Sequence, residues 1–175
     1  MSCVVFAVHI PVPGLAMDKA KLLQVVIAQV EAKLAELRAG YETSRDAVLS
    51  TPHVMKSKRE VFGQESAYLA NALALSIQER EQELRTLQGL RLPGNPERVA
   101  LGCLVGLAGP GGASSYYFLL PVCGGMEVAA EVGGPTVRII TSGTPVARAL
   151  LGKSEGDEVA LPTTPRTYAV LTALE

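Results

Sequence analysis

Two segments of the chain repeat apolar residues with the seven-residue period of a coiled coil. The first seam, with spacings of four and three, consists of Leu23, Ile27, Val30, Leu34, Leu37 and Tyr41. The second seam, with the same spacings, consists of Ala70, Leu73, Ile77, Arg80, Leu84 and Leu87. A stretch that contains Pro52 and Gly63 separates them. Two seams and one interruption predict an antiparallel helical hairpin, with arms of about 30 residues and roughly 45 Å each.

After residue 92 the pattern becomes strand-like. A segment with two prolines and one glycine, 92–97, predicts a linker. The β-prone runs that follow are 99–107, 115–122, 137–141, 157–161 and 167–174, with glycine-rich turns between them. One short helix interrupts the strands, with Thr144 as N-cap, Pro145 in its first turn and Gly152 at its end. We expect an α+β fold: an antiparallel coiled-coil hairpin, then a small antiparallel sheet domain with one short helix.

These patterns divide the chain into four parts. Residues 1–16 are an apolar N-terminal extension, 17–91 a coiled-coil finger, 92–97 the linker and 98–175 the C-terminal domain. Asp18 is placed to cap the first helix. The extension lacks the basic start of a secretory signal, and no apolar run reaches the roughly 18 residues of a membrane span. We therefore expect a cytoplasmic protein that does not contact membranes.

Composition narrows the functional classes. Lys and Arg total 16 and Asp and Glu total 17, so the net charge of −1 argues against a direct grip on nucleic-acid phosphates. Three cysteines without a CxxC motif predict reduced thiols, not a disulfide framework or a zinc site. The run GPGGASS at 109–115 lacks the Gly-Lys-Ser/Thr ending of a phosphate loop and predicts a hairpin turn. No motif indicates an active site of the chain's own.

Carboxylates gather near the predicted tip of the finger. They are Glu42, Asp46, Glu60 and Glu65. Glu60 and Glu65 are five residues apart, about 140° around a continuous helix, and would converge only if the helix breaks at Gly63. Convergent carboxylates on a projecting tip would complete a Mg²⁺ site supplied by a partner. The alternative is ordinary surface charge among the basic residues at 56–59.

The stretch ITSGTPVARALLGKSEGDEVAL at 140–161 resembles the C-terminal signature of the bacterial GreA/GreB transcript cleavage factors. The matching positions are Thr144, Pro145, Ala147, Arg148, Leu150, Leu151, Gly152, Lys153, Gly156, Asp157, Glu158 and Val159. The order of a coiled-coil hairpin and a β-rich domain is also that of the family, so the resemblance covers residues 17–175. It implies that the C-terminal domain is FKBP-like.

The resemblance implies a transcription elongation regulator that binds bacterial RNA polymerase and inserts its finger into the secondary channel. Thr144, Pro145 and Arg148 would then contact the polymerase. At the tip, Glu60 and Glu65 would help to hold a catalytic Mg²⁺ that belongs to the polymerase, which cleaves backtracked RNA. The chain would be a monomeric accessory factor without enzymatic activity or a cofactor of its own, and would meet the RNA 3′ end only indirectly.

The tip departs from the family's pattern of one acid followed by a second acid three residues later. With Glu60 in the first position, Gly63 occupies the second. An alignment on the family's Glu-Asn-Ala-Glu-Tyr stretch instead places Gln64 opposite the first Glu. Only a one-residue gap would bring Glu65 into an acidic position. Two activities therefore stay open. The chain either stimulates cleavage, or it binds in the channel and only inhibits or modulates the polymerase.

Two further functions are alternatives. An FKBP-like peptidyl-prolyl isomerase or chaperone would need an aromatic pocket, for which this half offers Tyr116, Tyr117, Phe118 and Tyr168. A coiled-coil scaffold would need an apolar stripe beyond the seam that the hairpin itself uses.

Overall fold

A computed structural model describes residues 18–50, 56–109, 112–129, 134–162 and 167–175; in the two long helices it places the side chains of residues 19–46 and 68–88. The elements are α1 (Lys19–Ser50), α2 (Lys56–Gln88), β1 (Leu104–Ala108), β2 (Ser114–Leu119), β3 (Glu127–Ala129), β4 (Thr136–Ile140), α3 (Pro145–Leu150), β5 (Glu158–Leu161) and β6 (Thr167–Leu174). The α+β class is confirmed. No helix in the described ranges combines the length and the apolar character that a membrane span requires.

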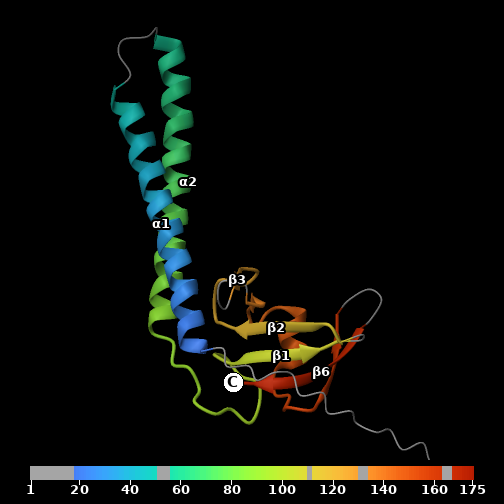
Figure 1. Cartoon of the computed structure of the whole chain (residues 1–175). Coiled ribbons are helices and arrows are strands. Elements are labelled where there is room, and N and C mark those ends of the chain that lie inside the picture. Colours follow the sequence, from blue (N-terminus) through green and yellow to red (C-terminus); the bar gives the residue numbers. More distant parts are fainter. Residues whose placement is uncertain (1–17, 51–55, 110–111, 130–133, 163–166) are drawn as a thin grey trace, which may run out of the picture.

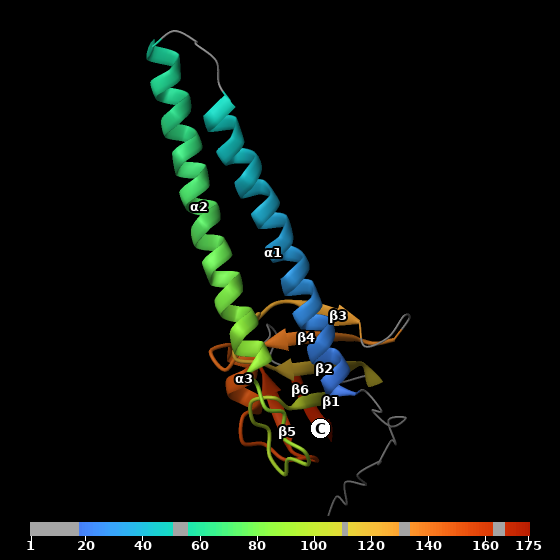
Figure 2. The same cartoon turned by 90° about the vertical axis from the view of Figure 1, so that its left-hand side faces the viewer.

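Helices α1 and α2 run antiparallel and project from the sheet as a finger (Figures 1 and 2). They contain 32 and 33 residues, so each is roughly 50 Å long. Every predicted seam residue is buried or half-buried. At one edge of the seam, the Arg38 guanidinium of α1 donates to the Glu81 carboxylate of α2 at 2.7 Å. Asp18 caps α1, because its Oδ1 accepts the N–H of Ala20 at 2.9 Å.

The predicted interruption of the hairpin is shorter than the sequence suggests. Helix α2 begins at Lys56 and continues through Gly63, so the two helices are separated only by residues 51–55, which lie outside the described part. A single internal glycine weakens a helix by about 1 kcal/mol and does not by itself end it. Gly63 therefore does not mark an end of either helix.

The six strands form one sheet in the order β3-β4-β2-β1-β6-β5. The prediction of a wholly antiparallel sheet is wrong at one pair, because β2 and β4 are parallel. The cause is β3, a three-residue edge strand that the sequence pattern did not reveal. Strand β4 folds back against β3 and lies between β3 and β2, so it runs in the direction of β2. The glycine-rich run at 109–115 connects the antiparallel pair β1–β2, as predicted.

Strand β1 begins five residues later than predicted, at Leu104 instead of residue 99. The preceding backbone pairs with the end of α3 instead. The Val99 N–H donates to the Lys153 carbonyl at 2.8 Å, and the Val99 carbonyl accepts the Gly152 N–H at 3.0 Å. These two bonds hold Val99, just after the linker, against the residues that follow α3.

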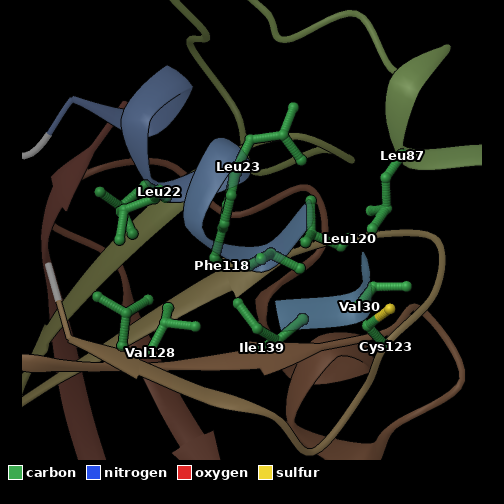
Figure 3. Packing of buried hydrophobic residues seen from close by; sticks show 12 residues of the cluster. Leu22, Leu23, Val30, Leu87, Phe118, Leu120, Cys123, Val128 and Ile139 are labelled. Carbon is green, nitrogen blue, oxygen red and sulfur yellow. The ribbon is translucent and has the colours of Figure 1, made fainter. Parts of the chain in front are cut away.

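Both faces of the sheet are covered, each by a different helical element. Alternation along the strands sends Leu104, Phe118 and Ile139 to one face and their neighbours Val105, Leu119 and Ile140 to the other. The first face packs against the base of the finger through Leu22, Leu23, Val26 and Val30 of α1 and Leu87 of α2 (Figure 3). The second packs against Ala147 and Leu150 of α3. The finger and the sheet thus share one hydrophobic core.

This shared core predicts that the finger base and the sheet unfold together. Replacing Leu22, which is buried against the sheet, by Ala should lower the free energy of unfolding by about 2–5 kcal/mol. Urea titration followed by far-ultraviolet circular dichroism and by amide exchange in β2 should give one coincident transition. Val25→Ala, at an exposed α1 position, is the matched control and should change stability by less than about 0.5 kcal/mol. A helix transition that shifts while β2 exchange does not would contradict a shared core.

Candidate functional site

Helix α3 is a six-residue element with a capped first turn. The Thr144 Oγ1 accepts the Ala147 N–H at 3.2 Å and donates to the Thr141 carbonyl at 2.8 Å. Pro145 occupies the start of the helix, where its missing N–H costs no hydrogen bond. The prediction of a Thr144 cap is confirmed. Two hydrogen bonds of the Thr144 hydroxyl group therefore hold the first turn in place.

The side chains of α3 divide into an anchoring and an outward set. Ala147 and Leu150 are buried in the second core, whereas Pro145 and Arg148 are exposed. Gly152 ends the helix in the left-handed region, at φ +77°, where an L side chain would be strained. The predicted partner-binding residues therefore share one short element: Thr144 shapes its first turn, and Pro145 and Arg148 face outward.

The rest of the signature builds the turn that leads into β5. The Asp157 carboxylate accepts the Ser154 N–H at 2.9 Å, and the Asp157 N–H donates to the Ser154 carbonyl at 3.1 Å. Gly156 sits between them at φ +89°. Val159 is then buried in the second core. Many signature residues thus serve the local fold. Those with exposed side chains that could meet a partner include Pro145, Arg148, Leu151 and Glu158.

The predicted acidic tip lies in the part of α2 whose side chains are not described. The backbone is helical from Lys56 to Gln88 without a break at Gly63. Residues 60 and 65 are therefore about 140° apart around one helix, and the break that would bring them together is not present. The role of Glu60 and Glu65 stays a prediction. On the other arm, the Glu42 carboxylate pairs with Arg45 at 3.4 Å in an exposed i, i+3 pair.

Over the described ranges, no group of three or more His, Cys, Asp and Glu residues is arranged to hold a metal ion. Glu60 and Glu65 lie outside the residues whose side chains are described, whereas Glu42 and Asp46 lie within them. A Mg²⁺ contribution from Glu60 and Glu65, made jointly with a partner, is therefore an expectation from the sequence resemblance alone.

A polar cluster where the finger meets the sheet went unrecognised at the sequence level. Arg80, the charged member of the second seam, donates to the Glu83 carboxylate at 2.5 Å. Glu83 in turn faces the thiol of Cys123, which is buried in the loop after β2. Burial raises the pKa of Cys123 to about 11, the Glu83 carboxylate contributes in the same direction, and Arg80 opposes it. Arg80, the charged residue of the second seam, is therefore paired with Glu83 where the finger meets the sheet.

Similarity to known proteins is found among solved structures. No protein-family model and no curated protein matches the chain. Solved structures similar to it include the GreA factor homolog 1 (Gfh1) of Thermus thermophilus, with 18% identity over 85% of this chain and 94% of that one and a TM-score of 0.34. Another is a structure of the transcription factor Gfh1, with 20% identity, coverages of 91% and 94% and a TM-score of 0.39. A third is Gfh1 of Thermus aquaticus, with 19% identity, coverages of 90% and 94% and a TM-score of 0.36.

The cap of α3 yields a stability prediction. Thr144→Ala removes the oxygen that accepts the Ala147 N–H and should lower the free energy of unfolding by about 1 kcal/mol. Thr144→Ser keeps that oxygen and should lose markedly less. Urea titration of the three proteins measures both differences. Equal losses for Ala and Ser would mean that the methyl packing of Thr144, not its hydrogen bond, stabilises the turn.

The thiol at the joint yields a pH prediction. Because the pKa of Cys123 is about 11 in the folded protein against an ordinary 9.0, folding favours its protonated form. That contribution is complete below about pH 9 and is lost as pH rises through about 11. The difference in free energy of unfolding between wild type and Cys123→Ala should therefore become smaller between about pH 8 and pH 10.5. All other ionisable groups are present in both proteins, so their contributions to the difference cancel. A difference in unfolding free energy that stays constant with pH would contradict the prediction.

Proposed function

We propose that the chain is a cytoplasmic transcription elongation regulator that binds bacterial RNA polymerase and inserts its finger into the secondary channel. The observation that carries the proposal is the 140–161 signature, formed here as a capped α3 with Pro145 and Arg148 exposed. The roughly 50 Å finger, joined to the same sheet through a buried core, fits the insertion step.

In this proposal the docking element and the finger have separate roles. Arg148 supplies a planar guanidinium for a carboxylate or backbone carbonyl on the polymerase. Pro145 offers a rigid apolar contact with little conformational entropy to lose. The finger base is held by the first core, so docking at α3 also fixes the direction in which the finger enters. The chemistry stays with the polymerase, and the chain is an accessory factor.

The continuous helix through Gly63 favours modulation or inhibition over stimulated cleavage. Cleavage stimulation in the proposed manner needs two carboxylates at one Mg²⁺. Residues 60 and 65 on one unbroken helix are separated by about 140°, which supports occupation of the channel without a shared metal site.

Prolyl isomerisation has weaker support because its aromatic residues are dispersed. Phe118 is buried beneath the finger base and Tyr116 packs beside it, whereas Tyr117 belongs to the opposite face of the sheet. Tyr168 is exposed on β6. These side chains do not line one pocket, and the face that carries Phe118 is covered by α1.

Stalled elongation complexes test the proposal directly. Wild-type protein should bind the polymerase and slow RNA extension once nucleotides are added. On a sequencing gel, the RNA in the stalled complex should not be shortened by the protein. Arg148→Ala should weaken binding about tenfold, the loss expected for an interface anchor. Arg91→Ala changes an exposed arginine that is not part of α3 and is the control that should bind normally.

Two results would change the proposal. Absence of polymerase binding by the wild type would overturn it. Shortened RNA that disappears with Glu60→Ala and Glu65→Ala would assign the carboxylates a role in cleavage and overturn the preference for modulation.

A further inference from the structure

The two arms of the finger differ sharply in charge. Between residues 66 and 78 of α2 there is no charged residue. The α1 stretch 31–46 contains seven, namely Glu31, Lys33, Glu36, Arg38, Glu42, Arg45 and Asp46. The outer face of a solvated helix normally carries charged and polar residues. The middle of α2 therefore has a composition that water alone does not explain.

The uncharged segment presents an apolar stripe on the outside of the hairpin. Its members are Tyr68, Leu69, Ala72 and Leu75, here called the neutral stripe. Tyr68, Leu69 and Leu75 are 76%, 53% and 62% exposed, and Ala72 is exposed between them. At 100° per residue, Tyr68, Ala72 and Leu75 lie within about 60° of one another around the helix. The backbone of residues 68–75 lies midway along α2 (Figure 1).

The neutral stripe is not needed to hold the hairpin together. The seam positions Ala70, Leu73 and Ile77 lie more than about 100° from the centre of the stripe and are half-buried between the arms. Towards the base, the stripe ends at Glu79, which is exposed on the same side of α2. Contiguous exposed apolar side chains bounded by a charge are typical of a surface that another protein covers.

A second copy of the chain is a poor occupant. Complete burial of the three large side chains would remove on the order of 400 Å² of surface per copy. A stable dimer buries about 800 Å² per partner. A partner that surrounds the finger needs no such area here, because it is already held at α3.

We propose that the neutral stripe packs against an apolar patch on the wall of the polymerase channel, and that this contact sets the rotation of the finger. The inference rests on the proposed function and adds to it a specific face and a specific chemistry. With α2 against an apolar wall, the charged outer face of α1 faces the opposite wall. The finger then contacts the polymerase along its length, in addition to the contact at α3.

The test is a double variant, Tyr68→Gln with Leu75→Gln, in the full chain. Both positions are exposed and glutamine is a good helix former, so helicity and urea midpoint should stay unchanged. The Kd for stalled elongation complexes should rise about tenfold or more. The ratio of variant to wild-type Kd should persist as salt rises from about 0.1 M to 0.3 M, because apolar contacts are not screened. Val25→Gln, on an exposed apolar position near the base of α1, is the matched control and should bind as wild type.

Each other outcome has one meaning. If the wild type binds and the double variant binds equally well, the neutral stripe is not a contact and the proposed function stands. If the wild type does not bind at all, the proposed function fails and this inference falls with it. If sedimentation shows a wild-type dimer that the double variant converts to a monomer, the occupant is a second copy and the inference is overturned.

Discussion

The apolar contact between the first turns of α1 and one face of the sheet determines how the rest of the molecule is arranged. A two-helix hairpin alone needs only its seam, and a six-stranded sheet could bury this face with any helix. Here Leu22 and Val26 of α1 fill the space above Phe118 and Ile139. Because interiors are close-packed, the finger cannot tilt at its base without opening a void in that core. The direction of the finger is therefore a property of the core and not of the linker.

The contact between the finger and the sheet also contains a polar cluster, formed by Arg80, Glu83 and Cys123. Arg80 lies on the second seam where an apolar residue would be expected, yet its charge is neutralised by Glu83 at 2.5 Å. Glu83 also faces the Cys123 thiol, so the cluster connects α2 to the loop after β2. A half-buried ion pair adds little net stability when its desolvation cost is counted. What the cluster adds is register, since sliding α2 along the sheet would separate the Glu83 carboxylate from the Cys123 thiol.

The sequence predicted the parts of this molecule that depend on local pattern. The two seams, the Asp18 and Thr144 caps and the Gly152 helix end each follow from residues close together in the chain, and each is present. The errors concern pairing. Strand β3 has three residues, too few for an alternating pattern, and it alone makes β2 and β4 parallel. The broad apolar face formed by Leu22, Leu23 and Val26 did carry a signal, because it exceeds what a seam requires and indicates a second contact surface.

In the candidate site, too, the sequence predicted local features and missed a contact between distant segments. The α3 signature was recognisable because its caps and turn are local, whereas the Arg80–Glu83–Cys123 cluster joins segments some 40 residues apart in the chain and no spacing rule reveals it. The same division bears on function. Thr144, Gly156 and Asp157 are required by the fold of the signature whatever partner the chain binds. A match at those positions indicates a shared local structure, and the exposed side chains decide what that structure does. Discrimination between a factor that stimulates cleavage and one that only occupies the channel must therefore come from the exposed residues of α3 and from the tip and outer faces of the finger, where the fold imposes the least constraint.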